Sequence, residues 1–230
     1  MVLAKIKKTA ASLVAISLLA LPLAAQAAGF GFDKTRLVLE NGKTSGNFVI
    51  KNGNDQGLLM KAHIEDSNNF LSPDGKAVPK LFQIKGQNAG RVRVVINPKN
   101  LPKDRETQFW LYTKAFPEIK LDRDTNQVNV NFVTRLKVFY RPQGITTNIH
   151  QANKSIDWKT DNGKLVAVNN SPLNLTVIGL THNGQSVRVS HMLKPYTQWE
   201  TNIRAKKSDE LAWDAINDDG GVDKNEGSVR

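Results

Sequence analysis

The 230-residue sequence contains no cysteine, so disulfide bonds and thiolate chemistry are excluded, and hydrophobic cores must hold the fold together. The common enzyme motifs are also missing: there is no Gly-x-Ser-x-Gly turn, no phosphate-binding glycine loop and no His-Glu-x-x-His sequence. The four histidines, His63, His150, His182 and His191, are scattered, with no cluster of metal-ligating residues near them. We therefore expect no enzyme, no cofactor and no bound metal ion.

Long apolar runs are absent except at the N-terminus. Three lysines precede an apolar run from Leu13 to Leu23, and the small-residue sequence Ala25-Gln26-Ala27 follows it. This order is typical of a secretory signal peptide cleaved after Ala27, and the run is shorter than the roughly 18 to 20 residues that a membrane span needs. We expect residues 1–27 to be removed and the mature protein to be exported without membrane insertion.

The net charge is positive, and cleavage would leave it so. The three lysines of the signal would leave without any acidic residue, so the formal charge of +11 would fall by three, to +8. An exported chain rarely meets nucleic acid, so we read this excess as a basic surface and expect no nucleic-acid partner. Anionic lipid is an alternative attraction, but no basic amphipathic helix supports it.

Convincing helical periodicity is also missing, and short apolar runs alternate with turn sequences instead. In the first half these runs cover residues 36–39, 47–51, 58–64, 81–84, 91–96, 109–116 and 128–140. After an interruption at Arg141-Pro142-Gln143-Gly144, they cover residues 156–159, 164–169, 173–180, 186–190, 198–203 and 211–216. The pattern predicts an all-β fold with two β-sandwich domains, residues 28–144 and 145–230, joined near Gly144.

Turn sequences refine this picture of the second domain. Asn162-Gly163 and Asn183-Gly184 are the strongest hairpin signals, because both residues of such a pair tolerate a positive φ. The segment after Gly220-Gly221 is polar and charged. We expect that segment to be flexible and to add no final strand.

The strand predicted at residues 128–140 carries the most information. Apolar residues alternate with asparagines at its start, so one face presents Val128, Val130 and Phe132. Three cations follow: Arg135, Lys137 and Arg141. Cations are rare in an apolar strand unless an anionic group meets them, so the segment combines an apolar row with a charged anchor. An ordinary half-buried strand with a solvated basic end fits the same pattern.

Two acidic segments are candidate partners for Arg141. Asp104-Arg105-Glu106 lies just before the strand at 109–116, and Ile216-Asn217-Asp218 lies near the C-terminus. Bidentate pairing with a carboxylate would fix the angle between the domains, because guanidinium geometry is directional. The alternative is an isolated surface ion pair of negligible energy.

Five segments occur in an order and spacing that together are specific, although none is decisive alone. They are Lys34-Thr35-Arg36-Leu37-Val38, Leu101-Pro102 through Trp110, residues 134–142, Asn170-Ser171-Pro172, and Ile216-Asn217-Asp218 with Gly220-Gly221. In these segments the chain resembles the periplasmic pilus-assembly chaperones of the PapD-like family, which work with an outer-membrane usher. The resemblance implies two immunoglobulin-like domains in an L-shaped arrangement, with fimbrial subunits, a tip adhesin and an usher as partners.

The resemblance also implies roles for the anchor and for the apolar row. Arg36 and Lys137 match the two cations that bind the C-terminal carboxylate of a pilus subunit. Val128, Val130 and Phe132 match the donor strand, which fills the groove of a subunit that lacks its own last strand. Such an exposed strand also makes a self-capping dimer of the free protein reasonable.

The remaining implied roles are structural. Glu106, Arg141 and Asp218 match the family's interdomain ion pairs, whereas the role of Arg135 stays open. The short segment from Pro117 to Asn126, together with the absence of cysteine, favours the class with a short loop before the donor strand, which generally builds rod-like pili.

A secreted immunoglobulin-like module for adhesion or carbohydrate binding is the alternative function, because it would share the signal and the fold class. Such a module is expected to carry aromatic residues on loops. The four tryptophans, Trp110, Trp158, Trp199 and Trp213, fall on predicted strands, where core packing is the more common use.

Overall fold

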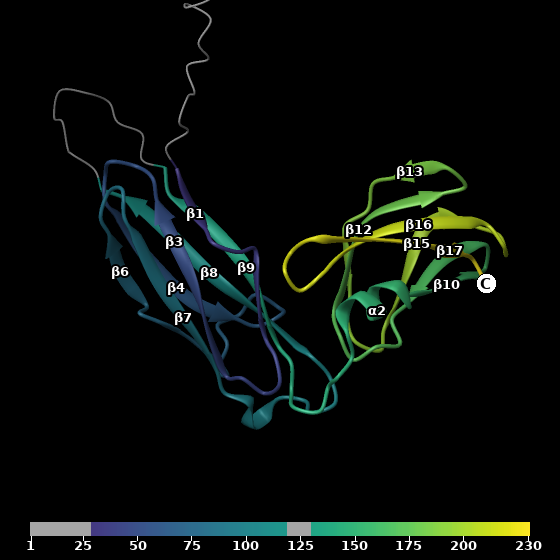
Figure 1. The fold of residues 1–230 in the computed structure, drawn as a ribbon, viewed down its shortest axis with the longest axis horizontal. Coiled ribbons are helices and arrows are strands. Elements are labelled where there is room, and N and C mark those ends of the chain that lie inside the picture. Colours follow the sequence, from purple (N-terminus) through teal and green to yellow (C-terminus); the bar gives the residue numbers. More distant parts are fainter. Residues whose placement is uncertain (1–28, 119–129) are drawn as a thin grey trace, which may run out of the picture.

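The computed structural model describes residues 29–118 and 130–230, which form two β-rich domains set at an angle like the arms of an L (Figure 1). Buried side chains make two separate hydrophobic clusters, one within residues Leu39 to Tyr140 and the other within Ile145 to Val229. The predicted all-β fold with two sandwich domains in an L is confirmed. No helix within the described residues is long and apolar enough to cross a membrane.

Two sheets form the first domain. One has the order β1-β3-β7-β5, made of β1 (Phe30–Phe32), β3 (Ser45–Asn52), β7 (Ala89–Ile96) and β5 (Gly75–Val78). The other has the order β2-β9-β8-β4-β6, made of β2 (Arg36–Leu39), β9 (Phe132–Tyr140), β8 (Thr107–Pro117), β4 (Leu58–Glu65) and β6 (Leu81–Ile84). A short 3-10 turn, η1 (Pro98–Asn100), precedes β8. Alternating side chains such as Met60, Leu111 and Val138 fill the space between the sheets.

The second domain is also a sandwich. One sheet has the order β10-β11-β15, made of β10 (Asp157–Asp161), β11 (Lys164–Val168) and β15 (Gln198–Arg204). The other contains β13 (Gln185–Val187), β12 (Leu175–His182), β16 (Glu210–Ile216) and β17 (Val222–Ser228), and β14 (His191–Leu193) also pairs with β12. A helix, α2 (Ile149–Lys154), precedes β10. Trp158 and Trp213 lie in the core with ring centroids 5.7 Å apart.

The two predicted hairpins are confirmed. Asn162 and Gly163 have φ values of 48° and 74° and connect β10 to β11, while Asn183 and Gly184 have φ values of 47° and 78° and connect β12 to β13. Two successive positive φ values define the hairpin turn whose twist matches that of the flanking strands.

Two expectations for the second domain are wrong. Residues 149–154 form a helix, which is too short to show helical periodicity but is capped by Asn148, whose Oδ1 accepts hydrogen bonds from the backbone N–H groups of His150 and Gln151. The polar segment after Gly221 is strand β17, which pairs with β16 along its whole length. An edge strand is held by backbone hydrogen bonds and needs no apolar alternation, and the buried Val229 fixes its end.

Some predictions fall on residues outside the described ranges. These are the signal peptide at residues 1–27, the donor residue Val128 and most of the segment that defines the short-loop class. They stay predictions.

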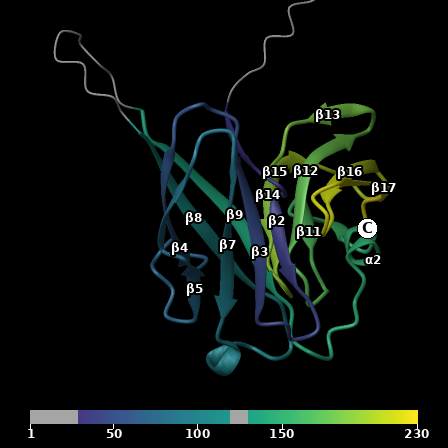
Figure 2. The same cartoon turned by 60° about the vertical axis from the view of Figure 1, so that its left-hand side comes forward.

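Turning the molecule shows how the domains face each other (Figure 2). In Figure 1, β9 is the labelled strand of the first domain nearest to the second domain, and in Figure 2 β2 lies beside the second domain. Because β2 and β9 carry the predicted anchor cations, this inner side is the place to look for a functional site.

Candidate functional site

Parallel pairing of β2 with β9 brings the two predicted anchor cations together. Arg36 is the direct partner of Lys137 in the register of these strands, although the two residues are far apart in the sequence. Paired residues on neighbouring strands point to the same face, which here is the face turned away from the first core. The second domain reaches this point, because Lys137 Nζ lies 3.4 Å from Thr176 Oγ1 on β12.

Both cations are withdrawn from water. Arg36 is only 8% exposed, and its Nε has no hydrogen-bond partner. Burial, and then the charge of Arg36, lowers the pKa of Lys137 to about 8. Within residues 29–118 and 130–230, no carboxylate forms an ion pair with either side chain. The arrangement is therefore complementary to an anion that would supply the missing charge and acceptor.

Aromatic rings support the two cations from the same sheet. The guanidinium carbon of Arg36 lies 5.7 Å from the centroid of the Phe139 ring, and Lys137 Nζ lies 5.8 Å from that of Trp110. Such contacts are favourable for a cation and restrict its side chain. The ammonium and guanidinium groups are thus held in place before any ligand arrives.

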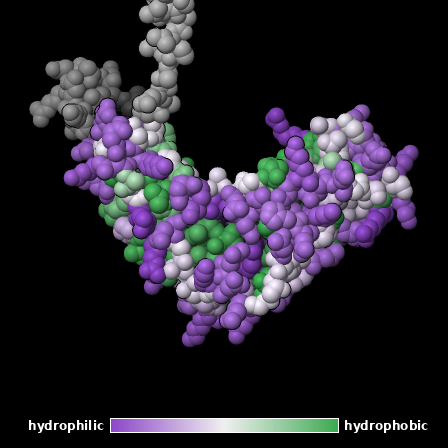
Figure 3. Space-filling model, viewed as in Figure 1, coloured by the Kyte–Doolittle hydropathy of each residue, from purple (hydrophilic) through white to green (hydrophobic). Residues whose placement is uncertain are grey.

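The apolar row lies at the other end of the strand and on its opposite face. Phe132 shares the side of β9 that carries the buried Leu136 and Val138, but it lies beyond the end of the core. Val130 is 55% exposed and Phe132 is 47% exposed, with the Phe30 ring 5.6 Å away. Figure 3 shows hydrophobic surface among the hydrophilic residues of this domain.

One prediction about this strand needs correction. The strand was predicted from residue 128, but its described part begins at Phe132, and Val130 belongs to no strand. The pairing of β9 with β8 ends at Phe132 and Ala115, close to Pro117, which has no N–H to donate. In the free protein, Val130 therefore precedes the described, hydrogen-bonded part of β9.

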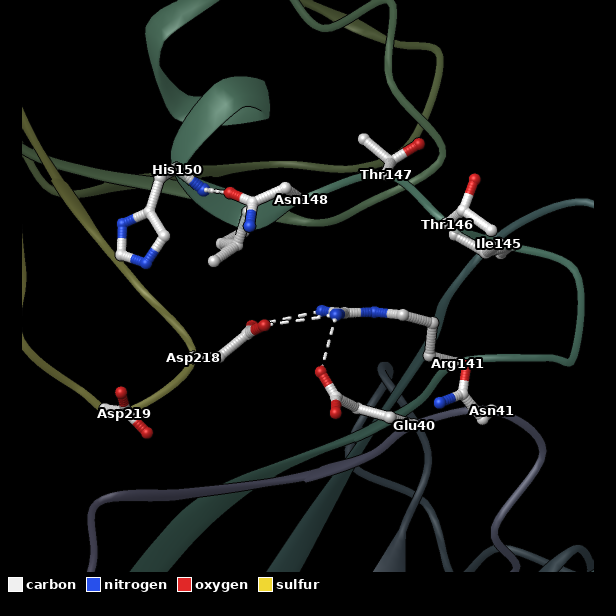
Figure 4. A pocket seen from close by; sticks show the side chains of 11 residues that line it. Glu40, Asn41, Arg141, Ile145, Thr146, Thr147, Asn148, His150, Asp218 and Asp219 are labelled. Carbon is white, nitrogen blue, oxygen red and sulfur yellow. Dashed lines mark hydrogen bonds and ion pairs between the residues drawn. The ribbon is translucent and has the colours of Figure 1, made fainter.

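The two predicted partners of Arg141, Glu106 and Asp218, both contact it, and Figure 4 shows Arg141 with Asp218 and Glu40. Arg141 Nη2 lies 2.9 Å from Glu106 Oε1, and the two terminal nitrogens donate to both oxygens of Asp218 at 3.0 and 3.1 Å. Sequence reasoning missed a third acid, Glu40, which accepts from Arg141 Nη1 at 3.2 Å. The guanidinium side chain is only 6% exposed, and Asp218 and Glu106 outweigh its desolvation and raise the pKa of Arg141.

Glu106 connects the first domain to the second in its own right. Its other oxygen, Oε2, accepts hydrogen bonds at 2.9 Å from the backbone and side-chain nitrogens of Asn174, and its backbone N–H donates to Pro172. A second close approach occurs at Gly220, where a Cβ atom would lie 2.4 Å from Thr35 Oγ1. The two domains are therefore joined by directional contacts beside the anchor strand β2.

The tryptophans and the potential metal ligands do not form a binding site of their own among the described residues. Trp158 and Trp213 are buried, so they offer no stacking surface, whereas Trp110 and Trp199 are half-buried. Within the described residues no group of three or more potential ligands is placed to hold a metal ion. The features that distinguish this molecule are the cationic pair, the exposed apolar end of β9 and the ion pairs between the domains.

Comparisons with known proteins agree with this arrangement. The family model for the pili and flagellar-assembly chaperone PapD N-terminal domain matches residues 29–146, and that for the pili assembly chaperone PapD C-terminal domain matches residues 151–227. Chaperone protein FocC of Escherichia coli is 27% identical over 199 residues, which cover 85% of this chain and 87% of FocC.

Solved structures share the fold. The crystal structure of the periplasmic chaperone SfaE has a TM-score of 0.75 at 25% identity, covering 88% of this chain and 100% of that one. A chain in the complex of the Salmonella enterica SafA pilin with the SafB chaperone has a TM-score of 0.79 at 19% identity, covering 89% and 98%. The resemblance found in the sequence is confirmed: this chain belongs to the PapD-like family of pilus assembly chaperones.

Proposed function

We propose that this protein is a periplasmic chaperone that captures fimbrial subunits by donating strand β9 and anchoring the subunit's C-terminal carboxylate at Arg36 and Lys137. The observation that carries the proposal is the cationic pair itself. Two partly buried cations lie side by side on paired strands, and no carboxylate among the described residues forms an ion pair with either of them, although Asp218 and Glu106 act on Arg36 from a greater distance. Membership of the family and the likeness to a chain in the complex of the SafA pilin with the SafB chaperone support the same conclusion.

The anchor suits a terminal carboxylate for physical reasons. Charge-assisted hydrogen bonds are about twice as strong as neutral ones, and a partly buried site is screened less than bulk water. A carboxylate would satisfy the orphan Nε–H of Arg36 and restore the ordinary pKa of Lys137. Thr176 lies close enough to add a hydroxyl from the second domain.

The apolar end of β9 supplies the second half of the mechanism. A subunit lacking its last strand exposes a hydrophobic groove and unpaired strand edges, and an added strand covers both. Val130 and Phe132 are each about half exposed, so burying the rest of each side chain would contribute roughly 1 kcal/mol, before the cost of ordering. Val128, by its spacing, is the third member of the row. Free protein with this surface exposed is also expected to self-cap as a dimer.

The anchor and the apolar row act as one unit in this proposal. A slip of one residue would turn the asparagines, instead of Val130 and Phe132, into the subunit groove. A carboxylate fixed at Lys137 prevents that slip, because it sets the distance along β9 from the anchor to the row. Phe132 and Lys137 are an odd number of residues apart on one strand, so the row and the anchor face opposite sides.

We also propose that Glu106, Arg141 and Asp218 hold the domain angle that keeps Thr176 close to Lys137, with the domain boundary at Gly144. Support comes from the two separate cores and from the contacts of Arg141 across the junction. The signal at residues 1–27 would direct the chain to the periplasm, where it would pass subunits and a tip adhesin to an outer-membrane usher. The short segment before β9 favours rod-like pili.

Co-purification tests the proposal. The tagged protein is expressed with a candidate fimbrial subunit encoded beside it, as wild type, Arg36→Ala, Lys137→Ala and the control Arg91→Ala, which removes an exposed cation from β7. We expect the subunit to co-purify with the wild type and with the control Arg91→Ala. It should not co-purify with Arg36→Ala or Lys137→Ala. Equal recovery from all four proteins would contradict the anchor, and recovery from none would contradict the chaperone function.

A further inference from the structure

Arg135 lies on the same face of β9 as the anchor residue Lys137, two residues away and therefore about 7 Å along the strand. Its side chain is 44% exposed and accessible to a ligand. The pattern of the sequence assigned it no role, and the anchor and the apolar row do not use it.

Neighbouring side chains hold the Arg135 guanidinium in a fixed orientation. Arg135 Nε donates to Glu65 Oε2 at 2.9 Å, and the guanidinium carbon lies 5.5 Å from the centroid of the Tyr112 ring. Tyr112 stacks in turn on His63, with ring centroids 4.6 Å apart, and His63 Nε2 lies 3.1 Å from Glu65 Oε1. Glu65 is buried, so this support belongs to the body of the domain.

Within residues 29–118 and 130–230, the terminal nitrogens of Arg135 have no hydrogen-bond partner. Among the described residues, the hydrogen bonds of Arg135 use Nε alone. The two terminal nitrogens therefore present a planar pair of N–H donors, which matches the two oxygens of a carboxylate. Because the orientation is already fixed, less conformational entropy is lost on binding than for a free arginine.

The charge of the surrounding face favours an acidic ligand. Strand register places three successive rows on this face: Arg36, Lys137, Trp110 and Glu65; then Arg135, Tyr112 and His63; then Val133, Lys114 and Lys61. Glu65 is the one acid in these rows, and Arg135 already pairs with it. A ligand carrying a carboxylate would be attracted to this face, whereas a lysine would be repelled.

We propose that Arg135 determines which subunits this chaperone prefers, by binding a carboxylate side chain of the bound subunit close to its anchored C-terminus. The inference rests on the proposed function, because the anchor at Arg36 and Lys137 brings the end of the subunit to this face. Arg135 then adds a second polar contact, which depends on the subunit's sequence, whereas a terminal carboxylate is common to all subunits.

Synthetic peptides test this assignment. They alternate valine and threonine, end in a free carboxylate, and carry Glu, Gln or Lys in turn at each position near the C-terminus. We expect wild type to bind one Glu peptide roughly two- to fivefold more tightly than its Gln counterpart, the range of a half-exposed ion pair. Arg135→Gln should remove that preference, Arg135→Glu should transfer it to the Lys peptide, and the control Arg91→Gln should keep it.

Arg135 also neutralises Glu65, so a purely structural role must be separated from recognition. Arg135→Gln leaves the buried Glu65 carboxylate without its cation and should lower the melting temperature. The double variant Glu65→Gln/Arg135→Gln removes both charges and should recover stability while the preference for Glu stays lost. A preference that returns with stability would overturn the assignment.

The remaining outcomes are distinct. The assignment of Arg135 would also be overturned if wild type bound Glu and Gln peptides equally at every position. An unchanged preference for Glu in Arg135→Gln would overturn it as well. Peptides with a C-terminal amide probe the anchor separately. If amide and acid peptides bind equally, the anchor fails, and the difference between Glu and Gln still decides the role of Arg135. Failure of every peptide to bind wild type would contradict both proposals.

Discussion

Replacing Arg141 with alanine removes the one side chain that contacts Glu40, Glu106 and Asp218 together. The loss of folding stability depends on which carboxylates remain buried without a cation. The Glu106 side chain is only 2% exposed, and without Arg141 its charge would keep only the two N–H donors of Asn174. Removing one partner of a buried ion pair costs about 3 to 5 kcal/mol, because the other charge stays buried and uncompensated.

The acidic partners of Arg141 differ in exposure, so variants of these partners should differ in stability. Glu40 is half exposed, so Glu40→Ala should cost less than about 1 kcal/mol. Glu106→Gln removes the charge that Arg141 compensates, so the double variant Arg141→Ala/Glu106→Gln should be more stable than Arg141→Ala, with a coupling energy of roughly 2 kcal/mol. Urea unfolding monitored by tryptophan fluorescence gives these free energies, and small-angle X-ray scattering follows the angle between the domains.

The pH dependence of the stability of Arg141→Ala tests whether the buried charge of Glu106 causes the destabilisation. Burial already raises the pKa of Glu106, and without the cation its pKa should rise further. A carboxyl whose pKa is higher in the folded state than in the unfolded state destabilises the fold above its folded pKa, and the loss shrinks as the pH falls toward the unfolded value. The destabilisation should therefore shrink as the pH falls toward the ordinary pKa of a glutamate, about 4.3. Stability within about 1 kcal/mol of wild type, with unchanged scattering, would refute the reasoning.

Three further predictions concern the anchor, the donor strand and the domain contact. Since the pKa of Lys137 is about 8 in the free protein, affinity for a carboxylate peptide should fall as the pH rises from about 7 to about 9.5, measured by calorimetry, and Lys137→Arg should remove that dependence. Val130→Ser should weaken subunit binding roughly tenfold or more with an unchanged melting temperature, because this side chain is exposed until a subunit covers it. Gly220→Ala should destabilise the junction by at least about 1 kcal/mol in urea unfolding, because φ is 84° there and a Cβ would meet Thr35, whereas Gly29→Ala, which meets no neighbour, should not.

Local features of the fold were accessible to sequence reasoning because they depend on near neighbours. Alternating apolar residues predicted most strands, and Asn-Gly pairs predicted two hairpins with the observed positive φ values. The same reasoning failed for α2, whose six residues cover less than two turns, and for β17, whose backbone ladder to β16 leaves no apolar signature.

The site was only partly accessible for the same reason. The resemblance nominated Arg36 and Lys137, but only the parallel pairing of β2 with β9 shows that they are direct neighbours. Contacts made by residues far apart in the sequence carried no local signal, as for Thr176 at the anchor, Asn174 at Glu106 and Glu65 at Arg135. Pairing of this kind depends on how the strands are ordered, and the periodicity of one strand says nothing about its neighbour.

The measurement that tests the central claim most directly is a cycle of dissociation constants for a subunit-derived peptide with a C-terminal acid or amide, against wild type and Arg36→Ala. If the carboxylate binds at Arg36, amidation should weaken binding to wild type roughly tenfold to a hundredfold, the range for a charged hydrogen bond, and should have little effect on Arg36→Ala. Equal losses on amidation in both proteins would show that the carboxylate does not bind there. Tight binding of the amide by wild type would contradict the anchor altogether.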